Sequence, residues 1–142
     1  MVSLGELGEQ VTAQWLQDQG WDIVASRWRC RWGELDLVAY KPAMGLIFVE
    51  VKTRQSKNWD ADGLCAITPQ KQKKLYRTAQ MFLSAYPQFS ELACRFDLAL
   101  VKARLLSAES DCQDALPPIN LNFPVSWQGY ELTLTTYLEG ID

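Results

Sequence analysis

Two stretches decide the fold of this 142-residue chain: Gly33-Glu34-Leu35-Asp36-Leu37-Val38 and Phe48-Val49-Glu50-Val51-Lys52. Both are strand-like apolar runs, in which an ionised side chain is costly unless it is paired or bound to a metal. Between them, Pro42 and Gly45 bracket a turn. We therefore predict an antiparallel hairpin centred near Ala43, in which position 40 faces 46, 38 faces 48 and 36 faces 50.

Side chains alternate between the two faces of a strand, so this register places Asp36, Glu50 and Lys52 on one face. Two carboxylates opposed in a sheet repel each other, and a divalent cation between them relieves the repulsion. The hairpin therefore predicts a hard-cation site beside a lysine. The alternative is that both carboxylates end their strands in solvent, while Lys52 pairs with Glu34, which the same register places opposite it.

The apolar residues of the hairpin favour the cation site, because a strand pair that is apolar on both faces lies in the covered centre of its sheet. One face is expected to hold Leu35, Leu37, Ala39, Ile47, Val49 and Val51, and the other Val38, Tyr40, Leu46 and Phe48. A charge placed in such a pair needs a physical reason, and metal binding supplies one.

Periodicity and turn signals place the other elements around the hairpin. A helix is predicted over 4–19, with Ser3 and Glu6 forming a capping box. A strand over 21–30 precedes the hairpin, and a loop over 55–68, a helix from Pro69 to about Tyr86 and a strand over 95–101 follow it. The order αβββαβ indicates an α/β sandwich with a mixed central sheet flanked by helices.

We expect a single domain over 1–142, with its core over about 3–102. A β-hairpin extension over about 117–142 begins at the break marked by Pro117 and Pro118. Its two strands are expected over 121–127 and 130–138. It caps a sheet edge or makes a subunit contact.

The composition indicates a globular protein and excludes several other classes. Apolar residues make up 48% of the chain, with six Trp, which excludes a disordered chain. Four cysteines without close spacing, in a chain without histidine, argue against zinc and indicate buried free thiols in a reducing cytosol. No secretory signal or membrane-spanning run is visible, so we expect a soluble cytoplasmic protein.

Charge is divided unevenly along the chain. The net charge is −3, whereas a nucleic-acid binder is expected to carry a basic patch. Residues 1–80 hold 11 Lys and Arg against 9 Asp and Glu, and residues 81–142 hold 3 against 8. The basic residues that permit phosphate contacts lie in the first part: Arg27, Arg29, Arg31, Lys71, Lys73, Lys74 and Arg77.

Four motifs resemble, in order and spacing, the YraN-like family of small bacterial endonuclease-like proteins. They are Gly5-Glu6-Leu7-Gly8-Glu9, residues 33–37, residues 48–54 and Arg95-Phe96-Asp97, and they cover about residues 3–102. The spacing of the acidic residues resembles that of the PD-(D/E)XK superfamily, because Asp36 is followed by thirteen residues and then by Glu50-Val51-Lys52. Leu35 stands where the superfamily name expects proline. The resemblance implies a restriction-endonuclease-like fold and a phosphodiester hydrolase that uses Mg²⁺ or Mn²⁺.

The resemblance and the chemistry of phosphodiester hydrolysis together assign roles to the site residues. Asp36 and Glu50 would hold the metal, with the Val51 carbonyl as a further oxygen ligand. Lys52 would orient the attacking water or stabilise charge on the phosphate. Glu9 lies on the helix stripe that faces the sheet and resembles a glutamate that completes the metal site in Holliday-junction resolvases; the alternative is a surface carboxylate.

Further residues are candidates for binding the substrate. Gln72 and Tyr76 resemble a Q-x-x-x-Y motif of recombination-type nucleases and share a helix face, although such a pair also arises by chance in a polar helix. Lys71 is a comparable candidate. Trp59, in a polar loop, is expected either to stack on an unpaired base or to cover the core.

These features predict a metal-dependent endonuclease acting on DNA, with branched or flapped DNA as candidate substrates. The alternative is a nucleic-acid-binding or assembly protein that retains the nuclease fold without turnover, which the acidic composition favours. A homodimer or a protein partner would add basic surface, and no membrane partner is expected. Arg95 and Asp97 are expected to form a structural ion pair.

Overall fold

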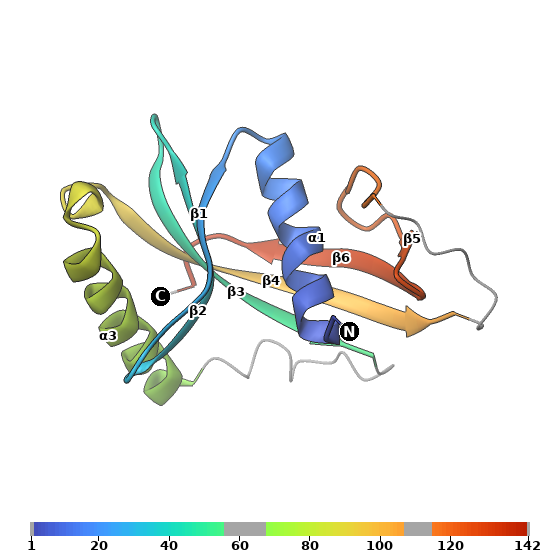
Figure 1. The fold of residues 1–142 in the computed structure, drawn as a ribbon, viewed down its shortest axis with the longest axis horizontal. Coiled ribbons are helices and arrows are strands. Elements are labelled where there is room, and N and C mark those ends of the chain that lie inside the picture. Colours follow the sequence, from blue (N-terminus) through green and yellow to red (C-terminus); the bar gives the residue numbers. More distant parts are fainter. Residues whose placement is uncertain (1, 56–67, 107–114, 142) are drawn as a thin grey trace.

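Six strands form one mixed sheet with a helix against each face (Figure 1). The structure is a computed structural model that describes residues 2–55, 68–106 and 115–141. Its elements are α1 (Leu4–Asp18), β1 (Asp22–Cys30), β2 (Gly33–Lys41), β3 (Gly45–Arg54), α3 (Pro69–Ala85), a 3-10 turn (Pro87–Phe89), β4 (Cys94–Leu105), β5 (Val125–Trp127) and β6 (Tyr130–Leu138). The predicted αβββαβ order is confirmed.

Local signals set the ends of both helices. The Ser3 hydroxyl accepts a hydrogen bond from the Glu6 amide at 3.2 Å, and the Glu6 carboxylate accepts from the Ser3 amide at 3.4 Å, so the predicted capping box is present. After α1, Gly20 adopts a φ of +95°, which disfavours any residue with a side chain. Thr68 caps α3, and Pro69 occupies its first turn.

The strand order is β1-β2-β3-β4-β6-β5. β3 and β4 pair in parallel, with α3 in the crossover between them, and every other recorded pair is antiparallel. β6 lies along the free side of β4, from Leu98 opposite Leu138 to Leu105 opposite Tyr130. The C-terminal extension therefore covers an edge of the core sheet, one of the two alternatives that the sequence left open.

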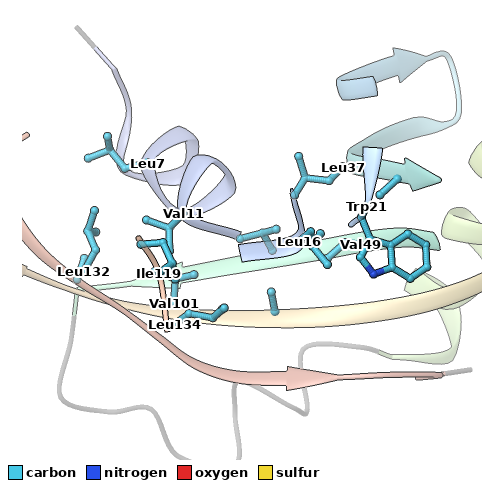
Figure 2. Close-up of a cluster of buried hydrophobic side chains, with 14 of the residues drawn as sticks. Leu7, Val11, Leu16, Trp21, Leu37, Val49, Val101, Ile119, Leu132 and Leu134 are labelled. Carbon is cyan, nitrogen blue, oxygen red and sulfur yellow. The ribbon is translucent and has the colours of Figure 1, made fainter. Parts of the chain in front are cut away.

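Two hydrophobic clusters cover the two faces of the sheet. The first joins α1 to β2, β3, β4 and β6; Figure 2 shows Leu7, Val11 and Leu16 of α1 above strand residues such as Val49 and Val101. The second joins α3 to the opposite face. The β2–β3 pair is therefore covered on both faces, as its apolar pattern predicts.

One residue departs from the predicted alternation. Leu35 lies in the α3 cluster with Val38 and Phe48, not on the face of Leu37 and Val49. The β2–β3 pairing ends at Leu37, so the strand turns beyond that residue and Leu35 packs toward α3. The expected face of Leu35 was therefore wrong.

The structure also bears on the predicted burial of the cysteines and on membrane-spanning helices. Cys94 is exposed and Cys30 is half-buried, so the prediction of buried thiols was wrong for these two; both are free. Cys65 and Cys112 lie outside the described residues. Within the described residues, no helix has the length and apolar character needed to span a membrane.

Candidate metal centre

The centre lies where β2 and β3 separate. Their recorded pairs run from Lys41 opposite Gly45 to Leu37 opposite Val49, which confirms the predicted facing of 40 with 46 and of 38 with 48. Beyond this point β2 continues beside β1, and β3 continues beside β4 as far as Arg54. Figure 1 shows the two strands running apart, so polar side chains at the fork can meet without breaking a ladder.

Asp36 is the first β2 residue beyond the last recorded pair. Its carboxylate Oδ2 accepts a hydrogen bond from the Val51 amide at 2.8 Å, so a side chain replaces the backbone partner at the fork. This bond holds the Asp36 carboxylate close to β3, where the charge of Glu50 acts on it. The sequence suggested the Val51 carbonyl as a metal ligand; the structure gives the Val51 amide a positioning role, and the carbonyl ligand stays a prediction.

Glu9 reaches the fork from α1. Only 8% of Glu9 is exposed, and Thr12 and Leu16 on the same helix stripe are buried. The prediction that this stripe faces the sheet is therefore confirmed. Carboxylate oxygens of Glu9, Glu34 and Asp36 all lie within 4.8 Å of one another.

Glu34 is a member of this group that the sequence interpretation did not propose as a ligand. Its position two residues before Asp36, on the same strand face, was the available signal. Its recorded ion pairs are with Arg29 at 3.0 Å and Arg27 at 3.8 Å. Glu50, which the sequence proposed as a ligand, is not part of this group of three, although its charge acts on the Asp36 carboxylate. We call Glu9, Glu34, Asp36 and Glu50 the acidic cluster.

Glu50 and Lys52 occupy the β3 side of the fork. The Lys52 Nζ lies 3.4 Å from Glu50 Oε1, and both side chains are mostly covered, at 21% and 19% exposure. The ammonium therefore sits beside a carboxylate of the acidic cluster, on the same strand face. Lys52 forms its recorded ion pair with Glu50, not with Glu34 as the structural alternative assumed.

Proximity and burial change the acidity of the cluster. Burial, followed by the charge of Glu50, raises the pKa of Asp36 to about 8, although the hydrogen bond from Val51 acts in the opposite direction. Burial raises the pKa of Glu9 to about 7, and the neighbouring carboxylates add to the rise against the opposing effect of Arg27. A positive charge near these carboxyls would favour their ionised forms and lower both pKa values.

Arg27 already supplies one positive charge. Its guanidinium lies 2.9 Å from Glu6, 3.6 Å from Glu9 and 3.8 Å from Glu34. The residue has a left-handed φ of +52°, which is uncommon for a side chain of this kind and turns it toward α1. Arg27 therefore pairs with carboxylates here, and the phosphate contact suggested by its place in the sequence stays a prediction.

The donor set fits a hard divalent cation. Carboxylate oxygens are the ligands that Mg²⁺ and Mn²⁺ prefer, and the site contains neither histidine nor cysteine. Two oxygens on one Mg²⁺ at about 2.1 Å lie at most about 4.2 Å apart. Three oxygens on one octahedral ion include at least two adjacent pairs, whose oxygens lie about 3.0 Å apart. Carboxylates spaced by up to 4.8 Å would therefore have to approach one another by up to about 2 Å to share one ion.

A groove lined by lysines opens beside the acidic cluster. It has a volume of about 190 Å³, and its walls include Glu34, Glu50, Lys52, Lys71 and Lys74. Lys71, predicted to bind substrate, thus lies at the same groove as Lys52. We call this space the lysine groove.

The other predicted substrate residues are dispersed. Gln72 donates a hydrogen bond to the Ile141 carbonyl at 3.1 Å, so the C-terminal segment holds its amide. Tyr76 is 38% exposed and contacts Phe96 edge-on. Trp59 lies outside the described residues.

Arg95 and Asp97 form the predicted structural pair. Arg95 donates to both Asp97 oxygens, at 2.8 and 3.0 Å. Asp97 is fully buried and also accepts from the Tyr137 hydroxyl at 2.5 Å and the Gly140 amide at 3.1 Å. Its hydrogen-bonding capacity is used within the fold, so it is a poor metal ligand.

Comparisons with known proteins agree on one family. The family model described as uncharacterised protein family UPF0102 matches residues 8–101. The chain is similar to a UPF0102 protein of Acaryochloris marina, 47% identical over 97% of this chain and 88% of the relative. It is also similar to UPF0102 proteins of a Synechococcus species (59% identical, 73% of this chain, 79% of the relative) and a Synechocystis species (41%, 97% and 96%).

Proposed function

We propose that this chain, which belongs to the uncharacterised protein family UPF0102, is a divalent-metal-dependent nuclease that hydrolyses phosphodiester bonds in DNA. The observation that carries the proposal is the fork between β2 and β3. There, Asp36 and Glu9 with raised pKa values meet Glu34, and Lys52 lies on the adjacent strand. Buried carboxylates are costly unless a positive charge balances them, and a bound cation would supply that charge.

Each side chain has a definite task in such a reaction. The acidic cluster would hold Mg²⁺ or Mn²⁺, which when bound activates water and neutralises charge on the phosphate. The Val51 amide keeps the Asp36 carboxylate in position. Lys52, partly desolvated beside Glu50, orients the attacking water or stabilises charge on the phosphate. Lys71 and Lys74 line the groove through which the DNA backbone would approach.

Cleavage of a panel of DNA substrates tests the proposal. Linear, nicked, flapped and four-way DNA are incubated with the protein in Mg²⁺, Mn²⁺ or EDTA. We expect metal-dependent cleavage by the wild type, enriched on branched or flapped DNA, and its loss in Asp36→Ala. Glu91→Ala is the matched control, because Glu91 is an exposed carboxylate distant from the fork in sequence. Wild-type cleavage that persists unchanged in Asp36→Ala would contradict the proposal.

The second candidate is a nucleic-acid-binding or assembly protein without turnover. Arg27 favours it, because its guanidinium balances part of the acidic cluster without a metal. The net charge of −3 favours it as well.

Metal dependence of binding separates the two candidates. A nuclease should bind DNA poorly in EDTA and better in Ca²⁺, since a cation removes the repulsion between carboxylates and phosphate. Asp36→Asn should then tighten metal-free binding while abolishing cleavage. Binding that is equally tight in EDTA and Ca²⁺, unchanged by Asp36→Asn and without cleavage in Mn²⁺, favours the binding protein.

A further inference from the structure

A second pocket lies between the β1–β2 turn and α3, outside the acidic cluster. It has a volume of about 550 Å³. Its walls carry four cationic side chains and two aromatic rings: Arg31, Lys73, Lys74, Arg77, Trp32 and Tyr76. None of the described residues that line it is acidic, although the chain as a whole has a negative net charge. We call it the aromatic pocket.

Both walls of the aromatic pocket are held in place. The β1–β2 turn packs so closely on α3 that a Cβ on Gly33 would lie 2.9 Å from the Thr78 hydroxyl. The Arg77 guanidinium lies 4.5 Å from the centre of the Trp32 ring, and the Arg31 guanidinium lies 4.9 Å from it. Figure 1 shows this turn beside the first part of α3.

The two aromatic rings remain accessible. Trp32 is 37% exposed and Tyr76 is 38% exposed, so each side chain keeps about a third of its surface open to a ligand. Tyr76 is anchored by Phe96, with 4.9 Å between ring centres. Exposed rings surrounded by cations fit a ligand that has both a flat aromatic part and negative charge.

The aromatic pocket adjoins the lysine groove. Trp32 and Lys74 line both spaces. A chain molecule that lies in the aromatic pocket can therefore continue past Lys74 to Lys52 and the acidic cluster.

We infer that the aromatic pocket binds unpaired nucleotides of a single-stranded DNA arm that adjoins the phosphate to be cleaved. Bases would stack against the parts of Trp32 and Tyr76 that stay open to solvent, and the four cations would contact the phosphates. Paired bases hide their faces inside the duplex, so a blunt duplex can use only the cations. The inference rests on the proposed function for the scissile phosphate and names the substrate class: DNA with a single-stranded arm.

Equilibrium binding tests the inference without cleavage. The Asp36→Asn chain in Ca²⁺ is titrated against fluorescently labelled oligodeoxythymidylate and against a blunt duplex of equal length. We expect Trp32→Ala to weaken binding of the single strand about five- to a hundredfold and to leave duplex binding nearly unchanged. Trp32→Phe, which retains a ring, should recover most of the affinity. Phe123→Ala is the matched control, because Phe123 is a 66% exposed aromatic residue outside the pocket.

Salt dependence tests the cations separately. Arg77→Ala should reduce the slope of log affinity against log salt by about 0.7 for single-stranded DNA. Lys102→Ala, which removes an exposed charge outside the pocket, should leave the slope unchanged. Melting temperatures confirm that each variant is folded.

The possible outcomes separate the inference from the proposed function. A folded Trp32→Ala variant that binds single strands as tightly as its parent overturns the inference, even if the wild type cleaves DNA. Displacement of the oligonucleotide by a glutamate-rich peptide, with the same dependence on Trp32, also overturns it and assigns the pocket to acidic peptides. Single-strand binding that depends on Trp32, in a wild type that cleaves no DNA, supports the inference and overturns the proposed function.

Discussion

The fold places the Asp36 side chain where its ionised carboxylate is unfavourable. Burial and the charge of Glu50 favour its protonated form, while the Val51 amide favours the carboxylate. A cation at the fork would satisfy both influences, because it would remove the repulsion without displacing the hydrogen bond. Metal binding at this residue should therefore be coupled to proton release.

The first prediction concerns pH. The pKa of Asp36 is about 8 in the folded state against an ordinary value of 3.8. Between these values the unfolded chain has lost the proton that the folded chain retains, so metal-free stability should fall as pH rises from about 5 to 8. Thermal melting in EDTA should show a fall of at least a few degrees.

Asp36→Asn is the control for this prediction, because asparagine still offers an oxygen to the Val51 amide but does not titrate. Its melting temperature should depend less on pH than that of the wild type. Saturating Mn²⁺ should stabilise the wild type more at pH 8 than at pH 5, and should barely affect the variant. Identical pH profiles for both proteins would show that Asp36 has no raised pKa.

The second prediction concerns the role of Lys52 in cleavage. Lys52→Ala should reduce cleavage about 10²- to 10³-fold, since a charge that stabilises the transition state is lost. The variant should still bind Mn²⁺ because the carboxylates remain. Binding is measured as the rise in melting temperature on addition of Mn²⁺. Loss of cleavage with loss of folding would instead make Lys52 a structural partner of Glu50.

At the scale of elements, the close approach of α1 to β3 positions Glu9. Gly8 lies against Thr53, and a Cβ at Gly8 would overlap the Thr53 hydroxyl and lie 3.1 Å from the Thr53 Cβ. The adjacent Glu9 reaches the fork because the helix lies this near to the sheet.

The third prediction compares two glycines of α1. Gly8→Ala should destabilise the protein by about 1–3 kcal/mol through overpacking, and should weaken Mn²⁺ binding because Glu9 moves with the helix. Gly5→Ala should stabilise it by about 0.5–1 kcal/mol, because Gly5 is exposed and alanine favours a helix. Denaturant unfolding and Mn²⁺ titration measure both effects. Equal Mn²⁺ affinity in a clearly destabilised Gly8→Ala would remove Glu9 from the metal centre.

At the scale of the whole molecule, the C-terminal extension belongs to the same core as the helices. Trp127, Leu132 and Leu134 are buried in the cluster that contains α1. Tyr137 and Gly140 donate hydrogen bonds to the buried Asp97. The extension also pairs with an edge of β4 that would otherwise invite association with another chain.

The fourth prediction is that a chain ending at residue 116 does not fold as a monomer. It loses several buried apolar side chains, each worth about 1.5–3 kcal/mol, which together approach the whole stability of a small domain. Size-exclusion chromatography should show aggregates, and circular dichroism should show no cooperative melting. Tyr137→Phe is the mild control and should cost about 1–3 kcal/mol while leaving a folded monomer. A truncated monomer that melts cooperatively would show that the core is complete without the extension.

Local sequence patterns determined most of the fold. Alternation and turn residues predicted the facing of 38 with 48 and of 40 with 46, whereas the predicted facing of 36 with 50 is not among the recorded pairs. Capping residues predicted the helix starts, and the burial of Glu9 decides between its two expected placements in favour of the sheet. These features depend on neighbours within a few residues along the chain, or on pairing across one short turn. Such interactions leave a periodic record in the sequence.

Only the tertiary structure decided which distant side chains meet. Nothing local marks the left-handed Arg27 that turns toward Glu6 and Glu9, or the Trp32 that packs on Arg77 of α3. The spacing of Glu34 from Asp36 was a local signal, but only the fold brings its carboxylate to that of Glu9. The acidic cluster forms where β2 and β3 separate, and the aromatic pocket forms where the β1–β2 turn meets α3. The side chains of both sites come from elements that are distant in the sequence and meet only through tertiary packing, so both sites exist only once the chain has folded.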